Sequence, residues 1–169
     1  HLKRETQKRY ANPGNYFGVV NMKESKAYLA YCGLNCKMCS IIATVPVQAN
    51  TLYNTMKDDG WEYWGAEVYP EFESFWKVLK DLCTKHETCP ACIGGCGNPE
   101  CQIRICAQAK GLEVCAFCEE FPCKLLADFS NAYPFILKNN ERIKEIGIEA
   151  WLKEQDELVA KGVTNRNQM

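Results

Sequence analysis

Cysteine is the residue type in this sequence that is best placed to do chemistry. The chain has 12 cysteines in 169 residues, and all but Cys83 fall into three groups. The groups are Cys32, Cys36 and Cys39; Cys89, Cys92, Cys96, Cys101 and Cys106; and Cys115, Cys118 and Cys123. Each group contains a Cys-x2-Cys pair, which is a poor distance for a disulfide but places two thiolates on one metal ion. The spacing therefore predicts metal binding by these residues.

The spacing permits two kinds of metal centre. A zinc ion in a four-cysteine site needs no further context and stabilises loops that cannot form a hydrophobic core by themselves. Iron–sulfur clusters use the same thiolate ligands at similar spacings. We expect zinc, with an iron–sulfur cluster as the alternative. The grouped cysteines would supply two four-cysteine sites with three residues left over, and a third site would need His86, whose other interpretation is a solvated loop residue.

Two residues near these groups have competing interpretations. Cys83 lies on the apolar stripe of a predicted helix, so we interpret it as a small buried hydrophobe and not as a ligand. Arg104 lies between Cys101 and Cys106. Its guanidinium would either offset thiolate charge by hydrogen bonding or form an ordinary ion pair.

A search for catalytic motifs finds little beyond the cysteines. The first group matches the Cys-x3-Cys-x2-Cys spacing of radical S-adenosylmethionine enzymes, but those normally use a large barrel of strands and helices. Only 130 residues follow Cys39, and their patterns are helical. The sequence has no credible Ser-His-Asp set, no phosphate-binding glycine loop and no His-Glu-x2-His motif. We therefore assign no catalytic and no cofactor-binding residues, and the sequence favours a role other than catalysis.

The segments that must position the cysteines have the periodicity of helices. The clearest begins after Pro70 and carries an amphipathic stripe of Phe72, Phe75, Trp76, Leu79, Leu82 and Cys83. A helix over 47–58 has Val47, Leu52, Tyr53 and Met56 on one face. Further helices are expected over 36–44 before Pro46, over 100–110, from Pro122 to Phe129 and from Pro134 to Ile146. A last helix after Gly147 is expected to carry Trp151, Leu152, Leu158 and Val159 and to end near Gly162. We predict a mainly α fold: a small cysteine-rich, metal-stapled helical domain with irregular zinc-binding loops.

Composition and charge limit the class of protein. Hydrophobic residues make up 47% of the chain, which is enough to bury a core. The longest apolar runs are far shorter than the roughly 20 residues that a membrane span needs. The net charge is −1, and because residues 1–21 carry +3, the remainder carries −4, which argues against nucleic-acid binding. We expect no membrane insertion and no nucleic-acid partner, whereas a protein partner and a small-molecule substrate stay open.

The chain divides into three parts. Residues 1–21 are polar and lack the apolar region of a secretory signal, so we interpret them as a leader or a flexible N-terminal arm. Residues 22–163 are expected to form a single cysteine-rich metal-binding domain, and residues 164–169 a frayed tail. Without export the thiols stay reduced, so we expect a cytoplasmic protein whose cysteines bind metal.

Several motifs in combination resemble a known family. They are the segments Tyr31-Cys-Gly-Leu-Asn-Cys-Lys-Met-Cys39, Cys89-Pro-Ala-Cys92, Cys101-Gln-Ile-Arg-Ile-Cys106 and Cys115-Ala-Phe-Cys-Glu-Glu-Phe-Pro-Cys123. They are similar to the prokaryotic cysteine-rich family called domain of unknown function 3795, over about residues 26–155. The resemblance implies a small cytoplasmic zinc-binding protein with no established reaction. It implies the grouped cysteines as ligands except Cys96, which stands where many members have glycine.

Three functions compete on these observations. The first is a binding or regulatory module of unestablished biochemical role whose zinc sites are mainly structural. In such a module, the aromatic stretch from Trp61 to Trp76 would either supply a partner groove or form the core over the amphipathic helix. The alternative is a redox enzyme with an iron–sulfur cluster or a zinc site with an open coordination position. A nucleic-acid-binding zinc module is the third, and the negative charge counts against it.

Overall fold

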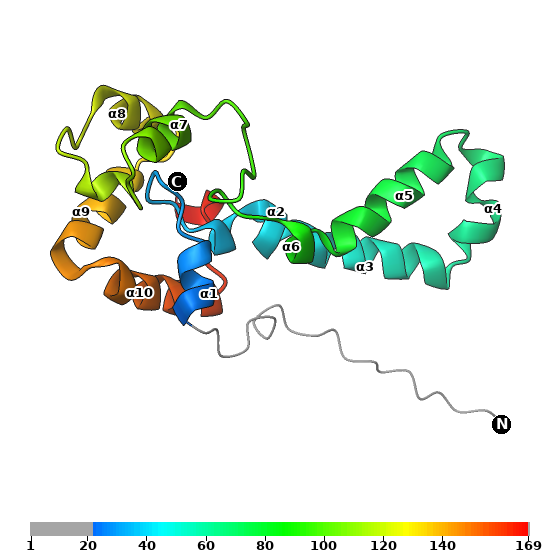
Figure 1. Ribbon diagram of the computed structural model, residues 1–169. Helices are drawn as coiled ribbons and strands as arrows, with labels where there is room; N and C mark the ends of the chain where they lie inside the picture. The colour runs from blue at the N-terminus through cyan, green and yellow to red at the C-terminus, as the bar shows by residue number, and fades with distance from the viewer. Residues whose placement is uncertain (1–21, 169) are drawn as a thin grey trace.

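The computed structural model describes residues 22–168, so the prediction for residues 1–21 lies outside the described residues. Residues 22–168 form helices joined by turns and loops, without a strand, and Leu29 and Asn35 form one isolated bridge. This confirms the mainly α fold. The helices are arranged as a cysteine-rich body and a long helical arm that extends from it (Figure 1). None of the described helices combines the length and the apolar character needed to cross a membrane.

The body comprises residues 22–44 and 84–168. Its helices are α1 (Met22–Ala27), η2 (Cys36–Met38), α2 (Ser40–Ala43), α6 (Lys85–Thr88), α7 (Gln102–Ala109), η3 (Cys115–Phe117), α8 (Lys124–Ser130), α9 (Ile136–Ile146), α10 (Ile148–Ala160) and η4 (Arg166–Gln168). Gly147, with a φ of 83°, separates α9 from α10 because glycine adopts this conformation without strain. The helix expected to begin at Pro122 begins at Lys124, and the last helix, expected after Gly147, begins at Ile148.

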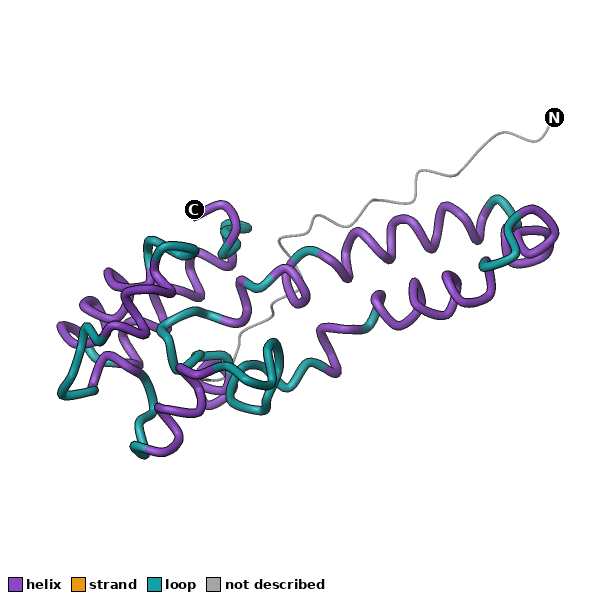
Figure 2. Tube along the Cα trace, turned by 90° about the horizontal axis from the view of Figure 1, so that it is seen from above, coloured by secondary structure: helices purple, strands orange, loops and turns teal. Residues whose placement is uncertain are grey.

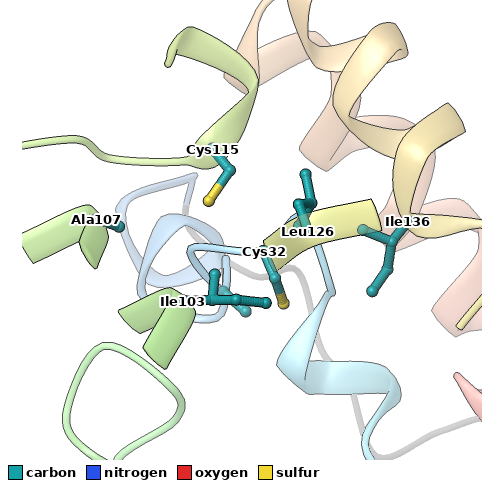
Figure 3. Packing of buried hydrophobic residues seen from close by; sticks show 7 residues of the cluster. Cys32, Ile103, Ala107, Cys115, Leu126 and Ile136 are labelled. Atoms are coloured by element: carbon teal, nitrogen blue, oxygen red, sulfur yellow. The ribbon is translucent and has the colours of Figure 1, made fainter. Parts of the chain in front are cut away.

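Two hydrophobic clusters hold the body together. The first joins the N-terminal loop to α7, α8 and α9, and its buried residues are Ala30, Cys32, Ile103, Ala107, Cys115, Leu126 and Ile136 (Figure 3). The second lies between the same loop, η3, α9 and α10, and its buried residues are Leu29, Val114, Ala116, Ile143, Trp151 and Leu152. Adjacent residues of one segment, 114–116, alternate between the clusters. Cys32 and Cys115 are therefore part of the packed interior of the body.

The arm comprises residues 45–83. Helices α3 (Val45–Asp58) and α5 (Phe72–Cys83) run side by side, and α4 (Trp61–Val68) closes the tip (Figures 1 and 2). The arm has a hydrophobic cluster of its own, with buried residues Ala49, Phe72, Trp76, Leu79 and Cys83. At Gly65 of α4, a Cβ atom would lie 2.6 Å from the Phe72 ring, so glycine permits this helix to pack closely on α5.

The structure of the arm confirms most of the predicted helical pattern and corrects the predicted apolar face of α3. Helix α5 buries most of the predicted stripe, although Phe75 is exposed. Cys83 is buried, as predicted, and its Sγ donates to the Leu79 carbonyl at 3.2 Å. On α3, Leu52 was expected on the same face as Tyr53 and Met56 but is exposed, whereas Ala49 and Tyr53 pack in the arm's cluster with residues of α5.

The segment after α10 packs back on the body, although a frayed tail was expected. The backbone N–H of Asn165 donates to the Met38 carbonyl at 2.9 Å, and its side-chain Nδ2 donates to the Asn35 carbonyl at 3.1 Å. Gln168 Nε2 approaches Met38 Sδ at 3.1 Å. The backbone N–H and the side-chain amide of Asn165 therefore satisfy two backbone carbonyls of the first cysteine loop.

Candidate metal centres

The structure brings the grouped cysteines into two sets within the body, and all of the chain's cysteines have free thiols. The first set comes from the two chain segments that flank the arm, and consists of Cys36, Cys39, Cys89, Cys92 and Cys96. The second comes from α7 and the loop before α8, and consists of Cys101, Cys106, Cys115, Cys118 and Cys123. Cys32 lies between the sets. Burial raises the pKa of its thiol, and nearby thiols of both sets contribute to the same shift.

Direct contacts hold the first set together. Cys89 Sγ donates to Cys96 Sγ at 3.1 Å, and the Cys92 backbone N–H donates to Cys36 Sγ at 3.4 Å. Burial, together with the neighbouring thiols of Cys92, Cys39 and Cys89, raises the pKa of the Cys36 thiol to about 12. Contact with Cys89 raises the pKa of Cys96. Negative charge on these sulfurs is therefore unfavourable, because they are partly desolvated and close together. A bound cation would offset this repulsion.

Arg104 supports the loop of the first set. Its side chain is buried, and Nη1 donates to the Cys92 and Cys96 carbonyls at 3.4 and 2.9 Å. Nη2 donates to the Asn98 carbonyl at 2.6 Å. The guanidinium therefore clamps the backbone of residues 92–98, which differs from both roles expected from the sequence. The fork of donors on arginine suits several carbonyls at once.

The first cysteine loop is fixed to α9 by asparagine. Asn140 is fully buried, and its Nδ2 donates to the Cys32 carbonyl at 2.8 Å. Gly33, with a φ of 85°, lies so close to Asn140 that an added Cβ would overlap its amide. Asn35 then caps η2 by accepting from the Lys37 N–H at 2.9 Å. The Gly and Asn of the Cys-Gly-Leu-Asn-Cys motif are thus required by local geometry.

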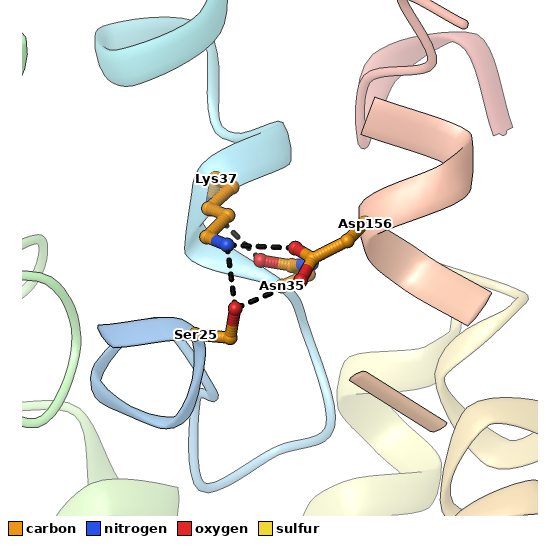
Figure 4. Close-up of polar contacts among 4 residues, drawn as sticks. All are labelled: Ser25, Asn35, Lys37 and Asp156. Atoms are coloured by element: carbon orange, nitrogen blue, oxygen red, sulfur yellow. Dashed lines mark hydrogen bonds and ion pairs between the residues drawn. The ribbon is translucent and has the colours of Figure 1, made fainter. Parts of the chain in front are cut away.

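Lys37 is a buried cation that the sequence-based assignment missed. Its side chain is only 2% exposed, yet Nζ lies 2.7 Å from the Asp156 carboxylate and donates to Ser25 Oγ at 2.8 Å (Figure 4). Ser25 in turn donates to Asp156 at 2.8 Å. The only sequence signal was a lysine placed between two candidate ligands, Cys36 and Cys39. Its partner lies far away in the sequence, on α10.

The second set surrounds a small cavity. The cavity has a volume of about 20 Å³, close to the space of a single water molecule, and its lining includes Cys106, Cys115, Cys118 and Cys123. Burial, together with the other thiols of the same set, raises the pKa of the Cys115 thiol to about 12. Lys110 Nζ lies 3.7 Å from Cys118 Sγ and 2.8 Å from Glu120. A positive charge therefore stands beside Cys118.

The donor chemistry of both sets fits zinc. Within residues 22–168 no three Cys, His, Asp or Glu side chains are arranged closely enough to hold an ion as they stand. Thiols that are buried and crowded favour the neutral form, and a metal ion reverses this by stabilising the thiolates. Binding would therefore draw the sulfurs of each set together. His86 lies on α6 with its Nε2 3.8 Å from the Glu87 carboxylate.

Comparison with known families places the chain. A family model described as "Protein of unknown function (DUF3795)" matches residues 28–128, a segment that contains every cysteine of both sets. The chain belongs to this family. The DUF3795 match ends within α8, so the similarity expected as far as residue 155 extends beyond it. No curated protein and no solved structure matches the chain.

Proposed function

We propose that this DUF3795 protein binds two zinc ions through its two sets of cysteines, and that both sites are mainly structural parts of a binding or regulatory module. The observation that carries the proposal is the cavity of about 20 Å³ whose lining includes four cysteines. Four thiolates are the ligand set of a closed structural zinc site.

The second site would use Cys106, Cys115, Cys118 and Cys123. Four thiolates around Zn²⁺ leave a net charge of −2, because each carries one negative charge. Lys110, 3.7 Å from Cys118 Sγ, offsets part of this charge by a charge-assisted contact. The zinc ion, when bound, would cross-link α7 to the loop that precedes α8.

The first site would use four of its five cysteines, and the contacts favour Cys36, Cys89, Cys92 and Cys96. The backbone N–H of Cys92 on Cys36 Sγ is the kind of donor that stabilises a metal-bound thiolate. Such a site would join the two chain segments at the base of the arm. Thiols stay free for this purpose in a reducing compartment, which supports a cytoplasmic location.

Metal analysis of the purified chain tests the proposal. We expect a colourless protein with about two zinc ions per chain, one per four-cysteine site. Cys118→Ser is expected to lower this to about one ion, and Cys89→Ser to do the same through the other site. Cys83→Ser is the matched control, because Cys83 is a buried cysteine of the arm outside both sets. Native mass spectrometry gives the stoichiometry directly.

Two results would refute the assignment. If Cys83→Ser lost as much zinc as Cys118→Ser, zinc binding would depend on the overall stability of the fold and not on the thiols of the second set. A brown protein that contains iron and sulfide would instead support the alternative of an iron–sulfur redox enzyme.

A further inference from the structure

The tip of the arm carries aromatic side chains that the arm's own core leaves exposed. Tyr69 is 53% exposed and Phe75 is 41% exposed, although both belong to the aromatic-rich segment. Together with Met56, Trp61, Glu71 and Phe72 they line an open pocket of about 350 Å³, called here the tip pocket. Exposed aromatic area of this kind is a common feature of binding surfaces.

The rings of the tip pocket are ordered around Trp61. The Trp61 ring lies 6.0 Å from Tyr69 with an interplanar angle of 14°, and 6.3 Å from Phe72 with an angle of 26°. Phe75 extends the cluster, 6.2 Å from Phe72. Glu71 is the charged residue in the lining of this pocket. Aromatic faces beside a carboxylate attract an organic cation, because the ring face and the carboxylate are both electron-rich.

The charge around the tip pocket points to the same ligand chemistry. Residues 58–74 contain six acidic residues and no Lys, Arg or His: Asp58, Asp59, Glu62, Glu67, Glu71 and Glu73. The charge of −4 carried by residues 22–169 therefore consists of −6 in this segment and +2 elsewhere. A surface of one sign steers partners of the opposite sign and selects against like charge.

Two lysines of the arm, Lys57 and Lys80, lie over rings outside the tip pocket. Lys57 Nζ lies 5.9 Å from the centre of the Tyr53 ring, and Lys80 Nζ lies 5.6 Å from that of Trp76. Both rings are on the shaft of the arm, outside the lining of the tip pocket. These contacts show that two aromatic rings of the arm already accept alkylammonium groups, while Tyr69 and Phe75 of the tip pocket remain exposed.

We propose that the tip pocket is a docking site for a basic segment of a partner protein, with one lysine or arginine side chain inserted between the rings and Glu71. The surrounding acidic residues would attract the other basic residues of that segment. The aromatic rings of the pocket would pack against the apolar part of the inserted side chain. The proposal is independent of the metal sites, because it uses only residues of the arm.

Titration with a defined probe tests this inference. The probe is a short arginine-rich peptide, and its control is the same peptide with every arginine replaced by glutamine. The full chain in its metal-bound form is titrated, with tryptophan fluorescence for affinity and amide NMR shifts for location. We expect the arginine peptide to shift residues of the tip pocket, and the glutamine peptide to bind far more weakly.

Matched variants separate a pocket from general charge attraction. Glu71→Gln is expected to weaken binding about 3- to 10-fold, since it removes the carboxylate of the pocket. Glu73→Gln removes the same charge two residues away, outside the lining, and is expected to weaken binding less than about twofold. Phe75→Ala is expected to weaken binding about as much as Glu71→Gln. Tyr63 is 82% exposed and lies outside the lining, so Tyr63→Ala should have little effect on binding.

Three outcomes would overturn the inference. Equal weakening of peptide binding by Glu71→Gln and Glu73→Gln would show that acidic surface charge, and not the pocket, accounts for binding. Equal affinity for the glutamine peptide would exclude cation recognition. Shifts of tip-pocket residues that depend on protein concentration, and that the arginine peptide does not reverse, would identify a second copy of the chain as the occupant. Helix content by circular dichroism verifies that the variants stay folded.

Discussion

Lys37 shows at the scale of one residue how the cysteine loop is held. Its ammonium is almost fully buried between Asp156 and Ser25, and its ring contact to Tyr28 has a distance of 5.7 Å. A buried charge is costly unless it is paired and hydrogen-bonded, and here both conditions are met. The residue lies between Cys36 and Met38, so its pairing orients the first cysteine loop against α10.

The two partners of this pair are expected to differ in their effect on stability. Asp156→Ala leaves the Lys37 ammonium buried with only Ser25, and should lower the free energy of unfolding by about 2 to 4 kcal/mol. Lys37→Met should cost about 1 kcal/mol, because methionine fills much of the same space and Asp156, 29% exposed, retains water and Ser25. Urea unfolding of the metal-bound chain measures both changes.

Lys124→Met provides the control for the Lys37 and Asp156 variants. Lys124 pairs with Asp128 at 2.7 Å on the exposed surface of α8, so its removal should change stability by less than about 0.5 kcal/mol. A larger loss in Lys37→Met than in Asp156→Ala would contradict the view that the buried ammonium dominates the cost.

The junction of α9 and α10 shows how a pair of elements is held at the surface. Arg142 of α9 donates from Nε and Nη2 to the two carboxylate oxygens of Glu154 on α10, at 3.2 and 2.5 Å. The hydrogen bond from Arg142 lowers the pKa of Glu154, and the opposite charge lowers it further. The Glu154 carboxylate therefore stays ionised, and the ion pair intact, to a lower pH than an ordinary glutamate would allow.

The lowered pKa of Glu154 predicts a pH dependence. Its stabilisation is present above the unfolded pKa of about 4.3 and is lost as the pH falls through the lower folded value. Glu154→Gln should therefore reduce stability slightly at neutral pH and make the loss of stability below about pH 4.3 less steep. Acid denaturation followed by circular dichroism measures this slope.

Glu157→Gln is the matched control for the acid experiment, because Glu157 is an exposed glutamate of the same helix. Any release of metal at low pH affects both variants alike. An unchanged slope in Glu154→Gln, or an equal change in Glu157→Gln, would show that the contact with Arg142 does not govern this dependence.

The whole molecule combines two parts with different sources of stability. The arm packs on its own cluster, whereas in the body two hydrophobic clusters share space with the cysteine loops. Cys32 and Cys115 lie inside the first of these clusters (Figure 3). If both thiol sets bind zinc, removal of the metal acts on the body and not on the arm.

Chelation is therefore expected to loosen the molecule unevenly. Removal of zinc should speed amide hydrogen exchange by at least about tenfold in α7 and in the loop around Cys115, because metal binding contributes to folding. Helices α3 and α5 should keep most of their protection, since Asn50 of α3 and the Cys83 carbonyl of α5 stay joined at 2.9 Å. Hydrogen-exchange mass spectrometry before and after chelation measures this, and equal loss in arm and body would contradict it.

The sequence by itself determined the helical class, most helix positions and the candidate ligands. These features depend on local periodicity, on Gly and Pro, and on the spacing of nearby cysteines. Leu52 was misplaced because a periodic pattern does not reveal how many neighbours cover a helix. The sequence left open whether the aromatic residues of the tip are exposed or form a core, since exposed and buried aromatic residues look alike in a sequence.

Only the tertiary structure decided which distant residues meet. Cys36 and Cys92 lie 56 residues apart, and Lys37 and Asp156 lie 119 apart. The arm, folded as a hairpin, returns the chain to its starting point and so completes the first set of thiols. Such contacts depend on the packing of whole helices, which is a collective property that no local pattern encodes.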